Sequence, residues 1–430
     1  MPLGFAAAAA TAGIKASGRP DLALLTATGA TPASVGAVYT TNRFPAAPIA
    51  LSRRHLSGSG AGGSGSRGWT RAIVSSSGCA NAATGPAGEE DQRGIAEAVA
   101  EVLSVRPEET LALSTGLIGT RLPVDRIRTA LPVLVKALRS ADDGLGDAAE
   151  AMCTTDTQPK WASVTLAIPG AADGGRVTVT GIAKGVGMIH PGMATMLAVL
   201  LTDAAVSPEL LERMLRRAAV RTWNQLTVDG DTSTNDTVFL LASGAAGVSI
   251  DAEGPGLPGL SAAVQAVARS LARQQAADGE GATVLLTCQV SGAADDLDAR
   301  AVARSVVASS LVKAALHGRD PNWGRILAAV GNARLPGAEL LEPAGLDPGS
   351  AALRTGSRPR LDIDRLRIAI AGTPVFLGEP TPFDASAVRA AMGRQEVLVR
   401  VDLGLGSGTG EAFGCDLTEA YVVENSAYST

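Results

Sequence analysis

The chain is organised around Gly181-Ile-Ala-Lys-Gly-Val-Gly-Met-Ile-His-Pro-Gly-Met-Ala-Thr-Met-Leu-Ala-Val-Leu-Leu-Thr202. Glycine-rich, turn-forming residues lead into Thr195, and an apolar run begins directly after it. This order predicts a threonine at the start of a buried strand. A threonine hydroxyl is a weak nucleophile unless a base lies beside it, and cutting the chain before the threonine makes its own α-amine that base. An ordinary strand threonine is the alternative interpretation.

The residues before Thr195 favour the reactive interpretation. Strain at the Ala194–Thr195 bond would promote an N-to-O acyl shift, which is the chemical route to self-cleavage. Lys184 lies in the same turn-rich segment, although an isolated lysine there is more often solvated. Three glycines, Gly185, Gly187 and Gly192, together with Pro191 allow this segment to adopt strained or positive-φ geometry.

Composition limits the class of protein. The 430 residues are 46% hydrophobic and 18% charged, which indicates a globular chain with a large core and more than one lobe. A net charge of −5 without a basic cluster argues against a nucleic-acid partner. The four cysteines are far apart and there are three histidines, so we expect no metal site and a reduced, cytoplasmic chain. We expect no signal peptide and no transmembrane helix, hence no membrane association.

Hydrophobic periodicity predicts interleaved helices and strands, and therefore a mixed α+β fold with layered sheets. Ser207-Pro208-Glu209 is a helix start, and the stretches 92–103, 257–275 and 301–316 have helical spacing. Residues 57–68 are glycine- and serine-rich and predict a flexible loop inserted in a hairpin whose strands are 47–51 and 71–75. Further strands are predicted at 111–114, 163–168, 176–180, 196–201, 237–241, 283–290, 367–371 and 396–403.

Five polar stretches are candidates for function. Residues 114–120 either form an oxyanion-binding turn or a plain turn after a strand. Residues 154–160 form a turn or part of a polar pocket, and Asp320–Arg325 is a packing corner or a ligand contact. The threonine- and aspartate-rich stretch 227–237 lacks the spacing of a Ca²⁺ loop and predicts a hydrogen-bonded turn. Glu280 is a loop glutamate that is solvated unless its loop folds over a site.

Other catalytic arrangements find little support in the sequence. There is no Gly-x-Ser-x-Gly elbow and no Gly-x-x-x-x-Gly-Lys-Ser/Thr phosphate loop. Thr195 with its own amine is therefore the strongest remaining pair of nucleophile and base.

Short motifs in a fixed order resemble the bifunctional arginine-biosynthesis family of ornithine acetyltransferases (glutamate N-acetyltransferases). The resemblance runs from Gly13 to Thr430 and is carried by eight further blocks: Val38–Arg43, Ser114–Gly119, Thr154–Thr157, Ala183–Gly185, Met193–Leu197, Thr227–Thr237, Asp320–Arg325 and Cys415–Thr418.

This resemblance implies a layered α/β sandwich, similar to N-terminal-nucleophile hydrolases, that cleaves itself between Ala194 and Thr195. The products would be an α chain of residues 1–194 and a β chain of residues 195–430. Thr115 and Gly116 match the family's oxyanion hole. The substrate-binding positions of the family match Thr154, Lys184, Thr195, Glu280, Asn425 and Thr430.

The implied reaction is ping-pong acetyl transfer from N²-acetylornithine to glutamate through an acetyl-Thr195 intermediate, with no cofactor and with acetyl-CoA left open as a second donor. The resemblance also implies a dimer of αβ units. Ser76, Cys79 and Val186 depart from the family's usual residues. The alternatives are a self-processed aminopeptidase or amidase, a monofunctional acetyltransferase of secondary metabolism, and a binding protein that stays uncut.

Overall fold

The computed structural model describes residues 1–58, 68–171, 174–190, 196–337 and 354–426. The chain divides into two compact units, each assembled from separate stretches of sequence. Unit 1 comprises Met1–Gly185, Thr195–Ala218 and Thr232–Leu271, and unit 2 comprises Val186–Ala194, Ala219–Asp231 and Ala272–Thr430. The sequence showed no composition break between domains, because a division that crosses the chain several times leaves no linker to recognise.

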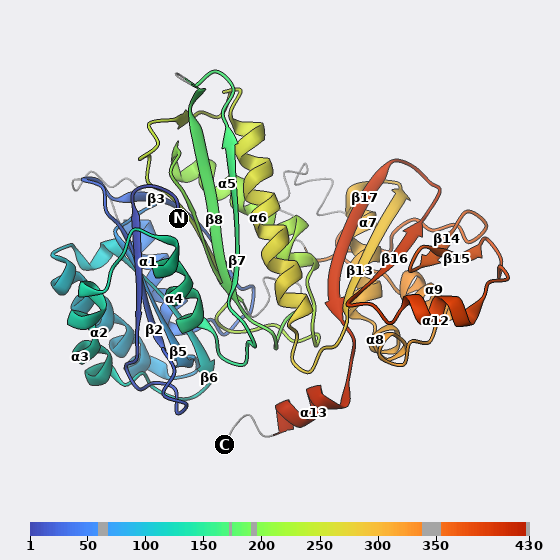
Figure 1. Ribbon diagram of the computed structural model, residues 1–430, viewed down its shortest axis with the longest axis horizontal. Helices are drawn as coiled ribbons and strands as arrows, with labels where there is room; N and C mark the ends of the chain where they lie inside the picture. Colours follow the sequence, from blue (N-terminus) through green and yellow to red (C-terminus); the bar gives the residue numbers. More distant parts are fainter. Residues whose placement is uncertain (59–67, 172–173, 191–195, 338–353, 427–430) are drawn as a thin grey trace. The chain divides into compact units, whose positions relative to one another are not determined.

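Unit 1 contains a four-stranded sheet in the order β1-β2-β5-β6 (Figure 1). Its strands are β1 (Phe5–Ala10), β2 (Leu22–Ala27), β5 (Ala72–Cys79) and β6 (Thr110–Leu117). The helices of this part of the chain are α1 (Ala47–Gly58), α2 (Gly85–Leu103), α3 (Val124–Lys136) and α4 (Asp142–Met152), and a 3₁₀ turn covers Pro107–Glu109. The β5–β6 pair is parallel and the other pairs are antiparallel.

A six-stranded sheet of unit 1 has the order β4-β3-β11-β9-β8-β7. Its strands are β3 (Ala33–Tyr39), β4 (Trp69–Thr70), β7 (Lys160–Ala167), β8 (Arg176–Lys184), β9 (Leu197–Thr202) and β11 (Thr237–Ala242). A small two-stranded sheet joins β10 (Ala205–Val206) to β12 (Ser249–Ile250). All six residues of β9 are buried, as the apolar run after Thr195 predicted.

The two large sheets of unit 1 face each other across a core that includes Phe5, Leu25, Val199 and Phe239 together with residues of α4. A second core lies on the other face of the four-stranded sheet, under α1, α2 and α3. The outer face of the six-stranded sheet meets α5 (Pro208–Arg221) and α6 (Leu257–Ala277). A Cβ on Gly181 would lie 2.9 Å from side-chain atoms of α6, so helix and sheet are in close contact. Unit 1 is therefore a layered α/β sandwich, as predicted.

Unit 2 is built on a five-stranded sheet in the order β15-β14-β16-β13-β17. These strands are β13 (Leu285–Ala293), β14 (Arg367–Ile370), β15 (Thr373–Leu377), β16 (Glu396–Asp402) and β17 (Gly408–Cys415). They share one apolar core with α7 (Asp296–Ala308), α8 (Ser310–His317), α9 (Trp323–Gly331) and α12 (Ala385–Ala391). A 3₁₀ turn at Trp223–Gln225 and the helix α13 (Glu419–Ser426) complete the elements of this unit.

Most predicted elements are confirmed, and two are wrong in detail. Residues 47–51 begin the helix α1 and do not form a strand, so the predicted pairing of 47–51 with 71–75 does not occur. Residues 59–67 of the predicted flexible loop lie outside the described residues. Pro48 lies in the first turn of α1, where a missing N–H is tolerated, and a short apolar run is ambiguous between strand and helix. The predicted helix 301–316 is divided at Ser309, whose backbone is extended and whose Oγ accepts from Val312 N at 3.3 Å.

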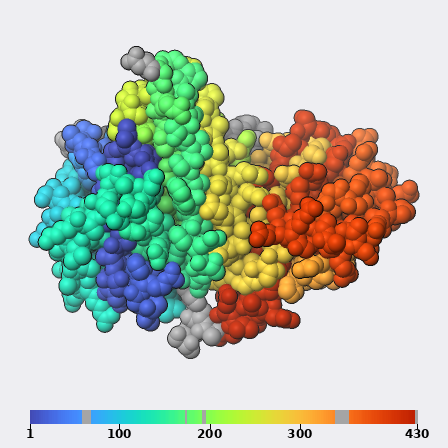
Figure 2. Space-filling model, viewed as in Figure 1, coloured from blue at the N-terminus to red at the C-terminus, as the bar shows by residue number. Residues whose placement is uncertain are grey.

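Two observations concern the surface of the chain. No helix among the described residues is long and apolar enough to cross a membrane. The outer strand β7 alternates between exposed and less exposed side chains after Lys160, and it lies at the surface of unit 1 in green (Figure 2). Such alternation is typical of an edge strand with one solvated face.

Candidate active site

Lys184, at the end of β8, connects two of the predicted site residues. Its ammonium Nζ donates to Thr154 Oγ1 at 2.8 Å and to Thr115 Oγ1 at 3.2 Å. The Lys184 side chain is only 5% exposed. The tertiary fold therefore brings together three residues that are separated by at least thirty positions in the sequence. Lys184 is a buried cation with hydroxyl partners, and the interpretation of a solvated turn lysine is wrong.

Asp156 supplies the negative charge beside this lysine. Its carboxylate accepts from Lys160 Nζ at 2.6 Å and lies 3.9 Å from Lys184 Nζ. The same carboxylate accepts from the backbone N–H of Gly185 at 2.8 Å and of Thr154 at 3.1 Å. Burial alone would raise the pKa of Asp156, but the two ammonium groups and these hydrogen bonds hold it below its usual value. The 154–160 stretch is thus both a turn and part of a buried polar cluster.

Gly116 lies where two backbones approach closely. Its φ is +131°, and a Cβ at this position would lie 2.2 Å from the carbonyl carbon of Gly78 and 2.5 Å from Cys79 N. Only glycine accommodates this contact, because any side chain would collide with backbone atoms. The pairing of β5 with β6 shifts register at the same point. The irregular end of β6 therefore lies at Gly116 and Thr115, and the Thr115 hydroxyl accepts from the Lys184 ammonium.

Asn235 supports this end of β6 from the 227–237 stretch. Its Nδ2 donates to Ser114 O at 2.8 Å and to Ala80 O at 2.7 Å. Asn235 is buried, so these bonds connect the segment before β11 to the ends of β5 and β6. The sequence predicted a hydrogen-bonded turn at 227–237, and its role in holding Ser114–Thr115 was missed because the partner strands are distant in sequence.

In unit 2, the glycine-rich segment continues past Gly185 and packs against Glu280. The backbone N–H of Glu280 donates to Val186 O at 2.8 Å. A Cβ on Gly187 would lie 2.2 Å from Glu280 Oε2, so glycine is needed for the carboxylate to approach this closely. Asn425 Nδ2 donates to the same Oε2 at 2.9 Å. Glu280 and Asn425, two of the predicted substrate-binding residues, are therefore in direct contact.

The loop that carries Glu280 is fixed by the Cys415–Thr418 motif. Asp416 accepts from Thr283 N at 2.8 Å and from Val284 N at 3.0 Å. Thr418 Oγ1 donates to Gly281 O at 2.7 Å. These bonds fix the residues that directly follow Glu280, so its loop is held against the Cys415–Thr418 motif and is not free.

Asp229 holds the backbone that precedes the predicted cleavage point. Its carboxylate accepts from the N–H groups of Met188 and Ile189, the latter at 2.9 Å. Met188 has φ +53°, an uncommon value for a side chain with a Cβ. His190 Nδ1 lies 3.2 Å from Thr227 Oγ1, and burial together with the charge of Arg304 lowers the pKa of His190 to about 4. Gly185 and Met188 thus have positive φ, whereas the Ala194–Thr195 bond, where strain was predicted, lies outside the described residues.

Thr195 itself, with Ala194 and Thr430, lies outside the described residues. Met196, the next residue after Thr195, is buried and its N–H donates to Asp236 Oδ1 at 3.1 Å. Met196 O accepts from Thr237 N at 3.1 Å, and this bond fixes the alignment of the start of β9 with β11.

The remaining motifs have structural roles. Asn322 Oδ1 accepts from Arg325 N at 3.3 Å at the start of α9, and Trp323 stacks near Phe376 with ring centroids 5.3 Å apart. The Asp320–Arg325 motif is therefore a packing corner. Among the described residues, no group of three or more His, Cys, Asp or Glu side chains is arranged to hold a metal ion.

The residues that depart from the family pattern are buried. Cys79 Sγ donates to Thr120 O at 3.1 Å, and Ser76 is also buried in β5. Val186 is 1% exposed, and its carbonyl is the acceptor for Glu280 N. Two of the departures thus lie in the strand next to β6, and the third contacts Glu280 through its backbone.

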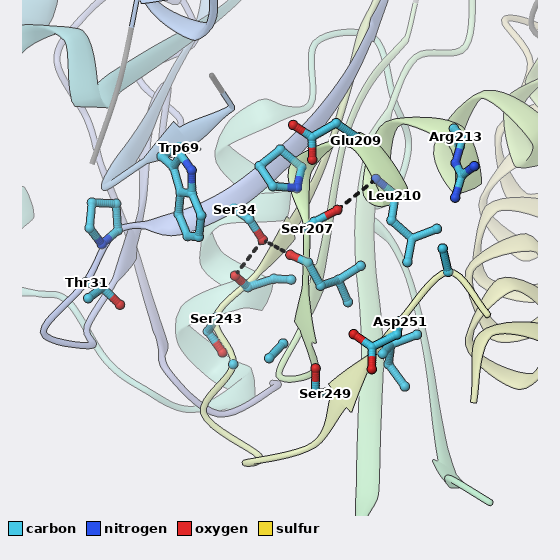
Figure 3. Close-up of a pocket in the computed structure, with 18 residues that line it drawn as sticks. Thr31, Ser34, Trp69, Ser207, Glu209, Leu210, Arg213, Ser243, Ser249 and Asp251 are labelled. Atoms are coloured by element: carbon cyan, nitrogen blue, oxygen red, sulfur yellow. Dashed lines mark hydrogen bonds between the residues drawn. The ribbon is translucent and has the colours of Figure 1, made fainter. Parts of the chain in front are cut away.

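A cavity of about 920 Å³ lies elsewhere in unit 1 (Figure 3). It is lined by residues of β3, β4, β10, β12 and the start of α5, including Ser34 and Trp69, and by Asp251, which follows β12. Ser34 Oγ donates to Val206 O at 2.6 Å, so this side chain is already engaged. None of the predicted site residues lines the cavity, and we do not assign the chemistry to it.

Comparison with known proteins decides the family. A model of the ArgJ family matches residues 6–430. The chain belongs to the ArgJ family. It is 46% identical over 430 residues to the arginine biosynthesis bifunctional protein ArgJ of Thermus thermophilus, with 100% of this chain and 99% of that protein covered. It is 43% identical over 444 residues to ArgJ of Thermosynechococcus vestitus, with 99% and 96% covered.

Among solved structures, ArgJ of Bacillus halodurans is 37% identical with a TM-score of 0.46, covering 53% of this chain and 96% of that chain. The resemblance inferred from the ordered motifs is confirmed by the family match. The ArgJ family consists of acetyltransferases of arginine biosynthesis, and this is the class of the chain. Asp156, Lys160, Asn235 and Asp236 were not among the predicted site residues. The sequence shows that these residues lie in stretches rich in polar side chains, but it does not show which distant residues they bind.

Proposed function

We propose that this ArgJ-family chain transfers the acetyl group of N²-acetylornithine to glutamate through an ester on Thr195. The observation that carries the proposal is the buried Lys184 ammonium, which binds the hydroxyls of Thr115 and Thr154 beside the close backbone approach at Gly116. Backbone N–H groups in a buried site stabilise the oxyanion of acyl transfer far better than they would in water, and a buried cation attracts a substrate carboxylate.

The precursor first cleaves itself. Thr195 Oγ forms a bond to the carbonyl carbon of Ala194 while the peptide C–N bond breaks and the hydroxyl proton passes to the nitrogen. Water then hydrolyses the ester, which leaves a carboxylate on Ala194 and a free amine and hydroxyl on Thr195. The positive-φ backbone of Met188, whose N–H group is held by Asp229, supports this step.

The transfer reaction follows the same pattern of bonds. Thr195 Oγ attacks the acetyl carbonyl as its proton passes to the α-amine, and ornithine leaves with that proton. The α-amine then removes a proton from the amine of glutamate, which attacks the acetyl ester and restores the hydroxyl. Thr115 and Gly116 stabilise the developing negative charge in both halves.

Substrate contacts are assigned by charge. Lys184 pairs with the carboxylate of the amino-acid substrate and Glu280 with its ammonium, with Asn425 and Thr430 contributing polar contacts. Asn425 already holds the Glu280 carboxylate, which keeps that side chain oriented. The reaction needs no cofactor, acetyl-CoA is a candidate second donor, and we propose a cytoplasmic dimer of αβ units.

Denaturing mass spectrometry of the purified wild type and of Thr195→Ala tests the proposal. We expect fragments of residues 1–194 and 195–430 from the wild type and one inactive chain from the variant. A folded wild type that stays in one piece contradicts the mechanism and favours the uncut binding protein.

An assay with N²-acetylornithine, with and without glutamate, separates transfer from hydrolysis. Ornithine release that does not depend on glutamate would show an amidase. Replacing the donor with acetyl-CoA tests the second activity, and its failure would indicate a monofunctional enzyme.

A further inference from the structure

Lys160 is a lysine without exposed surface whose ammonium group the proposed reaction leaves without a role. It begins β7 and lies opposite Ala183, the residue before Lys184, in the pairing of β7 with β8. Its Nζ donates to Asp156 Oδ1 at 2.6 Å and to Gln158 O at 3.1 Å. Burying an ammonium group is costly, so a lysine at this position requires an explanation beyond packing.

The two lysines share the carboxylate of Asp156 unequally. Oδ1 of Asp156 accepts a hydrogen bond from Lys160 Nζ, whereas Lys184 Nζ lies 3.9 Å from Oδ2, which is beyond hydrogen-bond distance. Lys184 instead donates to the hydroxyls of Thr115 and Thr154. Lys160 thus occupies the hydrogen-bonding position on the carboxylate, and the Lys184 ammonium is directed towards the two hydroxyls.

This cluster of three charged residues has a positive net charge. Asp156 contributes one carboxylate, and Lys160 and Lys184 contribute two ammonium groups. All three side chains are buried, so water screens their charges only weakly. The cluster therefore attracts an anion, and Lys160 supplies the charge that makes the sum positive.

The titratable groups beside the cluster leave this charge in place. Asp21 lies near Lys15, and these two opposite charges attract each other. Burial, together with the charge of Asp156, raises the pKa of the Cys153 thiol to about 11. Burial also raises the pKa of Asp236 well above its usual value. The thiol and the Asp236 carboxyl group therefore favour their uncharged forms.

We propose that Lys160 is a positioning residue for substrate binding: by holding Asp156, it leaves the Lys184 ammonium directed at the site, where it attracts the carboxylate of the amino-acid substrate. This inference rests on the proposed function, in which Lys184 pairs with that carboxylate.

Removing the Lys160 ammonium should redirect Lys184. The buried Asp156 carboxylate would keep Lys184 as the other ammonium group whose charge acts on it. A movement of Lys184 Nζ by about 1 Å would bring the two groups to the distance of a charge-assisted hydrogen bond. The resulting pair is neutral, so its attraction for a substrate carboxylate is lost.

Two ligands isolate the contribution of the carboxylate: ornithine, and 1,4-diaminobutane, which is ornithine without its carboxylate. The ratio of their dissociation constants, measured by titration calorimetry on the full-length protein as purified, defines a carboxylate preference. The wild type should prefer ornithine, and Lys184→Met should remove most of this preference. A wild type with no preference would reject the pairing of Lys184 with the substrate in the proposed function, which distinguishes that failure from a failure of the present inference.

Lys160→Met nearly keeps the length of the side chain and removes its charge. We expect the carboxylate preference to fall about tenfold or more, because a hydrogen bond to a charged group contributes at least such a factor, with little change in the affinity for 1,4-diaminobutane. Lys136→Met, at the exposed end of α3, is the matched control and should keep the wild-type preference. A folded Lys160→Met protein with the wild-type preference, or an equal fall in Lys136→Met, overturns the inference.

The double variant Asp156→Asn/Lys160→Met separates this role from a purely structural one. Its net charge at the cluster equals that of the wild type, and Lys184 no longer faces a carboxylate at position 156, so the preference should return towards the wild-type value. A preference as low as in Lys160→Met alone overturns the inference.

If Lys160→Met yields no folded protein, Lys160→Gln takes its place. The amide of glutamine is a hydrogen-bond donor without a positive charge, so the preference should again fall. An undiminished preference in folded Lys160→Gln overturns the inference.

Discussion

Replacing Asp156 by Asn should destabilise unit 1 more than any exposed charge substitution. Asp156 and Lys160 form an ion pair at 2.6 Å in which both side chains have no exposed surface. The amide of asparagine is nearly the same size, so the substitution removes the charge without creating a cavity. The buried Lys160 ammonium then loses the anion that compensates its desolvation.

The expected cost follows from this geometry. Removing one partner of a buried ion pair costs about 3–5 kcal/mol. Since each 1.4 kcal/mol is a factor of ten, local opening of the sheet should become roughly a hundredfold to a few thousandfold more frequent. Lys184 Nζ lies 3.9 Å from the same carboxylate and should also lose its orientation towards Thr115. The rate of acetyl transfer should therefore decrease together with the stability of unit 1.

Hydrogen-exchange mass spectrometry reports on unit 1 separately when it is read over β7 and β8. Glu212→Gln is the control, because Glu212 pairs with Arg216 on α5 with both side chains more than 40% exposed. Such a pair contributes about 0.3–0.5 kcal/mol, so the control should change exchange about twofold. Equal protection of β8 in Asp156→Asn and in the control would refute the argument that this buried pair needs its charge.

Three further outcomes are expected. The pKa of Asp156 is lowered in the folded state, so its contribution to stability is present above the unfolded pKa of about 3.9 and is lost as pH falls through the lower folded pKa. In urea titrations, the free energy of unfolding of the wild type should therefore decrease from pH 6 to pH 3, and this decrease should be smaller in Asp156→Asn. Gly116→Ala should abolish transfer and lower the melting temperature, because its Cβ would lie 2.2 Å from backbone. Gly119→Ala has the backbone strain of φ +83° but no atom within 4 Å of its Cβ, so it should lose far less; equal melting temperatures would contradict this. Asn322→Ala should cost about 1 kcal/mol through loss of the α9 cap, with acetyl transfer retained in a kinetic assay.

Local patterns in the sequence were sufficient for several elements. The apolar run after Thr195 predicted β9, and the structure places that strand at Leu197–Thr202. Ser207 was predicted to begin a helix, and its Oγ accepts from Leu210 N at 3.3 Å. These signals depend on residues within one or two turns, so no distant partner is needed to recognise them.

Other elements depended on context. Residues 47–51 are a short apolar run that suits a strand or a buried helix equally well, and packing made them the start of α1. The alanine-rich β1 has little strand propensity, and its position beside β2 in the sheet made it a strand.

The sequence alone identified Thr195 as the candidate nucleophile and, through the order of its motifs, the family. It also named Thr115, Thr154 and Lys184 as members of one site. Only the tertiary structure decided that the Lys184 ammonium binds both hydroxyls and that Asp156 balances its charge. The physical reason is that a buried polar group takes its partner from whichever strand end lies next to it, here 69 residues away in the case of Thr115. The turn-forming residues before Thr195 are neighbours in the chain, so the sequence is enough to recognise them. The charges and hydrogen bonds around the site depend on which strand ends the fold brings together.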